Sequence, residues 1–225
     1  MSAPDTTPRE NPPAVDGRLP GRRGRATRQR LLDETRALLD EVSYRELRVV
    51  DISRRAGTSP ATFYQYFPDV DAAVLSLVDS MVDDGSRRLR ALVTEPDWDD
   101  PAAASALAEG FLRFFEHHQS MLRVVDLAAT EGDERFHQLR VRLLNGVFLA
   151  LQELVYESQA GGCDDGKPEP GGAAGVLTAM LAHVSAHVPG YAAWGISRQA
   201  LADAMASYVR WSVAGPPPAS ESGES

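Results

Sequence analysis

Few side chains of this sequence have the types and spacing that catalysis or metal binding requires. His183 and His187 are four residues apart, so on a helix they would face the same way, a spacing that metal ligands use. No third ligand accompanies them, and the adjacent His117 and His118 cannot share one helical face. The single cysteine, Cys163, lies in a Gly-rich acidic segment without a cation or base to activate it. We therefore expect packing or surface roles for these groups, with no catalytic residue, no metal and no cofactor.

The segment GTSPATFYQYF (57–67) has side chains suited to binding and not to catalysis. Phe63 and Phe67 are four residues apart and should point into a core, which leaves hydroxyl, amide and small apolar groups on the other faces. Hydroxyls suit phosphate oxygens, the amide of Gln65 suits adenine, and small apolar side chains suit a thymine methyl group. The residues expected to face outward or sideways are Thr58, Pro60, Ala61, Thr62, Tyr64, Gln65 and Tyr66. They form a candidate face for double-stranded DNA.

Helices must position these side chains, because apolar residues recur at helical spacing and no stretch alternates like a strand. The first helix has an apolar stripe formed by Leu31, Leu32, Thr35, Leu38, Leu39 and Val42, and the second a face formed by Val49, Ile52 and Ala56. Gly57 should break the chain, Ser59 should cap a third helix over 60–67, and Pro60 suits its first turn. This order predicts a helix-turn-helix.

The rest of the chain is also predicted to be helical. Asp69 and Asp71 should open a long fourth helix, and later helices are expected at about 101–117, 119–129, 133–160, 172–194 and 197–213. The fold class is therefore all-α, an N-terminal three-helix head followed by a C-terminal helical body. The predicted divisions are a flexible basic arm (1–26), the helix-turn-helix head (27–72), the body (73–214), with a mobile connector at 161–171, and a disordered tail (215–225).

Charge is divided unevenly between these parts. The 225 residues have a net charge of −9, which taken alone argues against a nucleic-acid partner. Residues 18–67, however, hold eleven Arg against six acids, while residues 68–225 hold eleven basic residues against 23 acids. This partition predicts a polyanion-binding head on an acidic body. Six arginines precede the first helix and are candidates for the minor groove or phosphates: Arg18, Arg22, Arg23, Arg25, Arg28 and Arg30.

The segment VVDISRRAGTSPATFYQYFPDVDAAVLSLV (49–78) resembles the TetR family of one-component transcriptional repressors. The shared features are the A-G turn, the T-[LF]-Y-x-[YH]-F pattern and the proline after the last aromatic residue. With the first helix and the Ser43-Tyr44 turn, the resemblance covers roughly 27–80. It implies DNA contacts from Pro60, Ala61, Thr62, Tyr64, Gln65 and Tyr66, the two tyrosines mainly on phosphates. Arg25, Arg28, Arg48 and Thr58 complete the candidate set.

Two positions depart from the family pattern. Val70, between two acids, stands where members commonly place a phosphate-binding Lys, and Arg48 stands where Thr or Ser usually caps the second helix. Arg48 cannot cap that helix, but it has the length to reach a phosphate or a base. These departures keep an alternative open, a helical ligand- or protein-binding protein with a degenerate head.

The uncharged stretch 172–196 is too weakly hydrophobic for a membrane helix, so no membrane partner is expected. A helix that is apolar all round must be covered on every side. The resemblance implies that the last two helices form a four-helix bundle with a second copy. The residues expected in this homodimer interface are Leu177, Leu181, Leu201, Met205 and Tyr208.

The resemblance also implies a cavity for a small hydrophobic or amphipathic ligand in the body. The expected liners are Phe111, Phe114, Phe115, Met121, Leu122, Asn145, Phe148, Met180 and Trp194, with Asn145 as polar anchor. Ordinary core packing, or for Asn145 a hydrogen bond to a neighbouring helix, is the alternative. The sequence thus predicts a ligand-released repressor that binds a palindromic operator as a homodimer and is not an enzyme. An N-terminus without an apolar signal predicts a cytoplasmic location.

Overall fold

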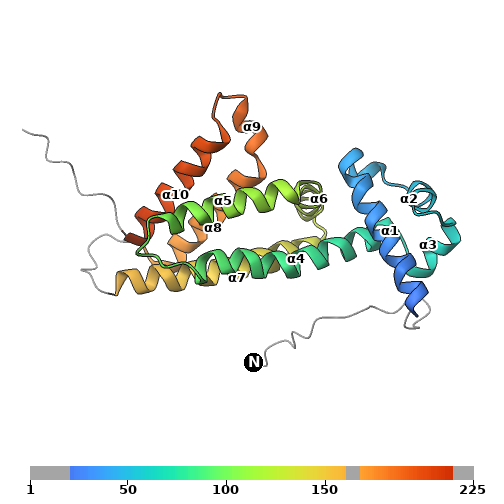
Figure 1. Ribbon diagram of the computed structural model, residues 1–225, viewed down its shortest axis with the longest axis horizontal. Coiled ribbons are helices and arrows are strands. Elements are labelled where there is room, and N and C mark those ends of the chain that lie inside the picture. Colours follow the sequence, from blue (N-terminus) through green and yellow to red (C-terminus); the bar gives the residue numbers. More distant parts are fainter. Residues whose placement is uncertain (1–20, 161–167, 215–225) are drawn as a thin grey trace, which may run out of the picture. The chain divides into compact units, whose positions relative to one another are not determined.

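The computed structural model describes residues 21–160 and 168–214, and within these ranges it contains helices and no strand (Figure 1). The all-α prediction is therefore confirmed. The helices are α1 (Arg22–Glu41), η1 (Tyr44–Glu46), α2 (Val49–Arg55), α3 (Pro60–Tyr66), α4 (Val70–Thr94), α5 (Ala102–His117), α6 (Gln119–Thr130), α7 (Glu134–Gln159), α8 (Pro170–Ala186), α9 (Val188–Ala192) and α10 (Arg198–Ala214). The predicted tail, most of the arm and most of the connector lie outside the described residues.

The chain divides into two compact units that meet between Ser80 and Met81, inside α4. The sequence placed the boundary earlier, at 72/73. The difference arises because the first turns of α4 belong to the core of the first unit, where Val74 and Val78 are fully buried. The fourth helix thus contributes residues to both units.

The core of the first unit is built on the predicted apolar stripes. Leu31, Ile52 and Phe63 have no exposed surface, and the Phe63 ring lies 5.5 Å from that of Phe67. Val42 is the exception to the α1 stripe, because the helix ends at Glu41 and leaves Val42 extended and exposed.

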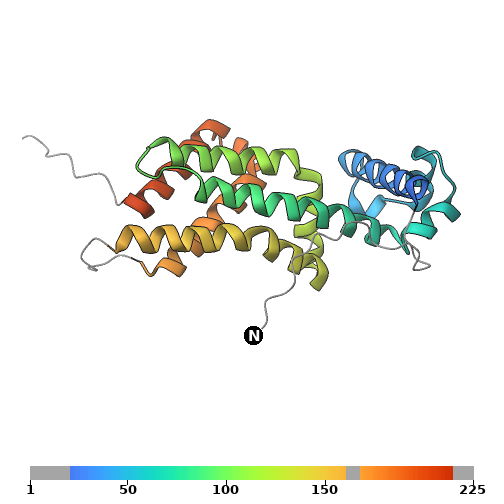
Figure 2. The same ribbon diagram turned by 60° about the horizontal axis from the view of Figure 1, so that its bottom comes forward.

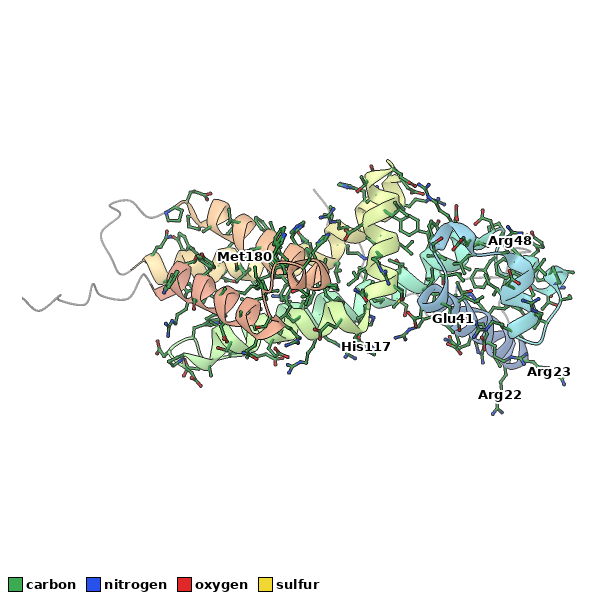
Figure 3. All side chains as sticks on the ribbon, turned by 90° about the horizontal axis from the view of Figure 1, so that it is seen from above. Arg22, Arg23, Glu41, Arg48, His117 and Met180 are labelled. Carbon is green, nitrogen blue, oxygen red and sulfur yellow. The ribbon has the colours of Figure 1, made fainter. Side chains whose placement is uncertain are left out.

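Helix α1 begins at Arg22, inside the predicted flexible arm of residues 1–26. Gly21 precedes it in an extended conformation, and the Arg25 amide donates to the Gly21 carbonyl at 2.9 Å. The arginines from Arg22 onward are therefore carried by a helix, and the arm prediction is wrong for residues 22–26. Figure 3 shows the Arg22 and Arg23 side chains pointing outward from this end of α1.

In the second unit, α8 packs against α5 and α7, α10 packs against α5, α7 and α8, and α6 packs against α7 (Figure 2). The C-terminal part of α4 packs against α5. Two glycines let α4 and α5 approach closely. A Cβ at Gly85 of α4 would overlap the Phe114 ring, and a Cβ at Gly110 of α5 would overlap Leu92. Each helix thus supplies one notch and one large side chain, which fixes their register.

The predicted helix 172–194 is two helices, α8 and α9. Helix α8 begins at Pro170, and the Glu169 carboxylate caps it by accepting hydrogen bonds from the Gly171 and Gly172 amides. These hydrogen bonds lower the pKa of Glu169. The helix breaks at His187, before the short α9. The physical reason is Pro189, which has no N–H to donate and whose ring collides with the carbonyl one turn earlier.

Candidate nucleic-acid interface and ligand cavity

The turn before α3 forms as its sequence predicts. Gly57 has a φ of +64°, a left-handed conformation that glycine adopts without strain, and the Thr58 amide donates to the Ser53 carbonyl at 2.9 Å. The Ser59 hydroxyl caps α3 by accepting from the Thr62 amide at 3.2 Å. These local bonds hold the start of α3 in one orientation.

Two faces separate on α3. Phe63 and Phe67 are buried, whereas Tyr64 is 51 % exposed and Pro60, Ala61 and Gln65 are also exposed. The half-buried residues at the edge of this exposed face are Thr58, Thr62 and Tyr66. All seven residues proposed from the sequence thus keep exposed surface, and their contacts with DNA remain a prediction.

Arg48 is exposed and directly precedes α2, and its side chain makes no capping bond there. Val50, the second residue of α2, is also exposed, at 59 %. Sequence reasoning passed over Val50 because a single exposed apolar residue has no distinctive pattern. Its methyl groups add apolar surface of the kind that meets thymine methyls.

Arg28 has intramolecular partners. Its guanidinium lies over the Phe67 ring, 4.9 Å from the centroid, and donates to the Ser76 hydroxyl at 2.7 Å. Partial burial lowers its pKa. Arg28 therefore ties α1 to α3 and α4, and its predicted DNA contact would compete with this role. Arg25 is exposed on α1, one turn before it.

The two acids beside Val70 have structural roles in the first unit. The Asp69 carboxylate accepts from the Ala72 amide at 2.7 Å and so caps α4. The Asp71 carboxylate accepts from the Tyr44 hydroxyl at 2.7 Å. Val70 thus lies between an acid that caps α4 and an acid that bonds to Tyr44.

A cavity of about 630 Å³ lies in the second unit between α5, α6, α7 and α8. Three predicted liners, Phe115, Leu122 and Phe148, are in its wall. The other residues around it are Val125, Asp126, Thr130, Arg140, Leu143, Leu144, Gly175, Thr178, Ala179, Ala182, His183, Ala186 and His187. A second hollow of about 200 Å³ shares Phe115, Leu122 and His187 with it. The volume of the larger cavity is within the range of small-molecule sites.

The remaining predicted liners lie elsewhere. Phe111, Phe114 and Met121 are core residues, Asn145 is exposed on α7, and Trp194 is 75 % exposed beyond α9. Met180 of α8 is half-buried and is not in the wall of this cavity (Figure 3). Asn145 and Trp194 are therefore misplaced by the prediction, because periodicity does not say which side of a helix meets a cavity. A signal that was missed is the small-residue row Gly175, Ala179, Ala182 and Ala186 at helical spacing.

The wall also contains polar and charged side chains. The Arg140 Nε and the Asp126 Oδ1 are 3.5 Å apart. The His183 and His187 rings are stacked with centroids 4.2 Å apart, and His187 Nδ1 lies 2.8 Å from the His183 carbonyl, to which it donates. Over residues 21–160 and 168–214, no three His, Cys, Asp or Glu side chains gather in a way that would hold a metal.

Four of the five predicted dimer residues are used inside the chain. Leu177, Leu181, Leu201 and Met205 are buried in the unit's own core, so the prediction is wrong for them. Their spacing marks the apolar face of each helix, and that face is taken by the intramolecular partner. Only Tyr208 is exposed, and its ring packs edge-on against Trp211 with centroids 5.3 Å apart. The other exposed large apolar residues between Pro170 and Val213 are Val176, Trp194, Ile196 and Trp211.

None of the described helices is both long enough and apolar enough to cross a bilayer. This finding includes α8, the helix at the centre of the uncharged stretch.

Comparisons with known proteins agree with both units. Residues 31–72 match the family model of bacterial regulatory proteins of the tetR family, and residues 89–220 match the Tetracyclin repressor-like C-terminal domain. The transcriptional regulator EthR of Mycobacterium tuberculosis is 30% identical over 98 residues, which are 43% of this chain and 45% of EthR. The chain thus spans less than half the length of this curated relative.

Solved structures share the fold. A transcriptional regulator from Rhodococcus sp. Rha1 has a TM-score of 0.65 at 19% identity, covering 85% of this chain and 99% of that one. FadR from Bacillus subtilis, solved in complex with stearoyl-CoA, has a TM-score of 0.61 at 16% identity, covering 84% and 99%. With the C-terminal model covering more than half of the sequence, the chain belongs to the TetR family of transcriptional regulators.

Proposed function

We propose that this chain is a homodimeric repressor that binds a palindromic operator through α3 and is released from it by a small hydrophobic or amphipathic molecule. The observation that carries the proposal is the division of α3 into a buried aromatic face and an exposed face of hydroxyl, amide and small apolar groups. A cytoplasmic, non-enzymatic role follows from this proposal.

The exposed face of α3 suits the major groove. Tyr64 and Tyr66 would donate to phosphates and set the position of the helix, while Gln65 has an amide that can pair with adenine. Pro60 and Ala61 would meet base edges where only small side chains fit. Arg22 and Arg23, at the exposed start of α1, would add contacts to phosphate.

Dimerisation would supply the two recognition helices that a palindrome requires, about one DNA turn or a multiple of it apart. The corrected candidate interface is the set of exposed apolar residues on α8 and α10, namely Val176, Tyr208 and Trp211. Val176 is 70 % exposed, next to the buried Leu177 on the same helix. One face of α8 would thus pack internally and the adjacent face on a second copy.

Ligand binding would act through α4. Phe115 and Leu143 line the cavity, and the Phe115 ring packs against Phe114 with centroids 5.9 Å apart. Phe114 in turn fills the notch at Gly85, and a Leu143 methyl would lie 3.0 Å from a Cβ there. A ligand that moves Phe115 or Leu143 would therefore press on α4. It releases DNA only to the extent that it binds the DNA-incompetent state more tightly.

The stearoyl-CoA bound to the structurally similar FadR supports an elongated ligand with an apolar part, and the four-helix cavity here has apolar walls to receive one.

A gel-shift assay with the DNA upstream of the protein's own gene tests the proposal. The full chain should shift a palindromic fragment, and Tyr64→Phe with Tyr66→Phe should weaken binding across all sequences by about tenfold or more, because two phosphate bonds are lost. Tyr156→Phe, on the exposed surface of α7, is the matched control and should bind like the wild type. Unchanged binding by the double variant would favour the alternative of a degenerate head.

A further inference from the structure

Arg28 of α1 is half-buried and contacts two other helices of the first unit. Its guanidinium lies over the ring of Phe67, 4.9 Å from the centroid, and Phe67 is the residue at which α3 ends. The same guanidinium donates to the hydroxyl of Ser76, in the second turn of α4, at 2.7 Å. One side chain of α1 therefore joins the end of α3 to the beginning of α4.

The partners of Arg28 are an aromatic ring and a hydroxyl, whereas Arg55 of α2 pairs with two carboxylates, Glu41 at 2.7 Å and Glu34 at 3.3 Å. A guanidinium that is partly withdrawn from water loses hydration, and for this reason burial lowers the pKa of Arg28. The ring face and the hydroxyl offset part of this loss, so the side chain is held between them.

Phe67 matters because the seven-residue α3 is too short to be stable by its own backbone hydrogen bonds. The ring of Phe67 is 2 % exposed, and its amide donates to the Phe63 carbonyl at 3.0 Å. Tyr64, Gln65 and Tyr66, which are proposed to contact DNA, directly precede it. A contact that fixes Phe67 therefore also fixes the direction in which these side chains point.

The same geometry disfavours Arg28 as a direct phosphate contact. One face of its guanidinium is occupied by the Phe67 ring, and one of its donors is directed to Ser76. Arg22 and Arg23, at the start of the same helix, are exposed and suit that role better.

We infer that Arg28 is a positioning residue, which holds the end of α3 against α4 through Phe67 and Ser76 and does not itself contact DNA. This inference rests on the proposed function, since it concerns how the same DNA-binding helix is held and released. A movement of α4 that separates Ser76 from Arg28 would loosen the end of α3, so this bond gives α4 a way to regulate DNA affinity.

Gel shifts with the palindromic fragment and with an unrelated duplex test the inference. Arg28→Gln should weaken binding to the palindrome about tenfold, and Ser76→Ala about fivefold, while binding to the unrelated duplex stays within about twofold. The double variant should bind within about twofold of Arg28→Gln, because both changes break one contact. The slope of log affinity against log salt should change by less than about 0.5 per protomer, since no phosphate contact is lost.

Arg55→Gln is the matched control for a general loss of stability. It removes ion pairs that join α2 to α1 and leaves the Arg28 contacts intact. It should lower the melting temperature at least as much as Arg28→Gln does, yet keep the affinity for the palindrome within about threefold. An equal loss of affinity in Arg55→Gln would overturn the inference.

Hydrogen exchange of the protein without DNA gives a second readout. Ser76→Ala and Arg28→Gln should each accelerate exchange of the Phe67 amide about fivefold, because the end of α3 opens more often. The Ile52 amide of α2, which donates to the Arg48 carbonyl at 3.1 Å, is the internal reference and should stay within about twofold.

The two readouts separate this inference from the repressor proposal. If the Phe67 amide exchanges faster in both variants but the wild type shifts no DNA, the repressor proposal fails and the positioning role stands. If its exchange is unchanged in both variants, the inference is overturned whatever the gel shifts show. A slope lowered by about 0.9 per protomer in Arg28→Gln, with unchanged affinity in Ser76→Ala, would also overturn it and make Arg28 a phosphate contact.

Discussion

The exposed face of α3 and the wall of the cavity are built in opposite ways. The first is supplied by one seven-residue helix and the turn before it, whereas the second is assembled from four helices. Spacing along a single helix determines which of its side chains share a face. Which faces of four helices enclose a space depends on how the helices pack, and no local spacing contains that information. The surface proposed to contact DNA is therefore a local property of the sequence, and the cavity proposed to bind a ligand is a tertiary one.

The largest effect expected in the first unit comes from Phe63→Ala. The ring is fully buried and lies 5.8 Å from Tyr64 and 5.5 Å from Phe67, so its loss should lower the free energy of unfolding by about 3–5 kcal/mol. Denaturant unfolding followed by circular dichroism measures this change.

Tyr64→Ala is the neighbouring control for Phe63→Ala. Because Tyr64 is half-exposed, its removal should change stability by about 0.5 kcal/mol or less while abolishing the gel shift. Equal destabilisation by the two variants would mean that α3 does not divide into a structural and a contact face.

The second unit should be most sensitive where α4 and α5 interlock. Gly85→Ala places a methyl group where the Phe114 ring lies, so overpacking should cost about 1–3 kcal/mol despite alanine's better helix propensity. Gly146→Ala meets nothing nearer than 3.6 Å and should be neutral or stabilising by up to about 1 kcal/mol. Thermal unfolding compares the two. If Gly85→Ala is stabilising, Phe114 does not pack closely against Gly85, and the proposed link between the cavity and α4 is contradicted.

The helix-turn-helix could be predicted from the sequence because each step of it is local. Gly57, Ser59 and Pro60 specify a turn, a cap and a first helical turn, and Phe63 with Phe67 specify the inward face, as the structure shows. Helix ends were less predictable where tertiary or proline effects decide them. Arg22 was assigned to an arm because no apolar residue marks the start of α1, and the break at His187 depends on Pro189.

The cavity was only partly predictable. Large aromatic residues were expected to line it, yet Phe111 and Phe114 fill the core and small residues of α8 form much of the wall. A cavity forms where the side chains around it are small, so a row of Gly and Ala residues predicts a cavity better than a row of Phe residues. The dimer residues failed for a related reason, because Leu177 and Leu181 mark the most apolar face of α8, and the chain covers that face itself.

Within the body, Arg198→Gln should have a smaller effect. Arg198 donates to Glu109 at 2.8 and 2.9 Å and to Glu116 at 3.1 Å, and these contacts lower the Glu109 pKa below its usual value. A carboxylate with a lowered pKa stabilises the fold above its unfolded pKa of about 4.3 and loses that contribution as the pH falls through the lower, folded value. The variant should be about 1 kcal/mol less stable at pH 7.

The pH profile of Arg198→Gln supplies the check on that prediction. Because the wild type loses the Glu109 contribution in acid, the stability difference between the two proteins should shrink below about pH 4. Melting curves at pH 7 and in mild acid measure it. A difference that stays constant with pH would show that Arg198 acts through packing alone.

The smallest effect is expected from deleting residues 1–20. This segment holds Arg9 and Arg18 against Asp5, Glu10 and Asp16, whereas Arg22 and Arg23 stand exposed at the start of α1 (Figure 3). Since each phosphate contact contributes about 0.9 to the slope of log affinity against log salt, the deletion should change that slope by less than about 1 per protomer. Arg22→Gln with Arg23→Gln should lower it by about 2. If the deletion lowers that slope by more than about 1, the segment before α1 supplies phosphate contacts. The electrostatic part of DNA binding would then depend on residues outside the helical head, whereas the contacts proposed for α3 lie within it.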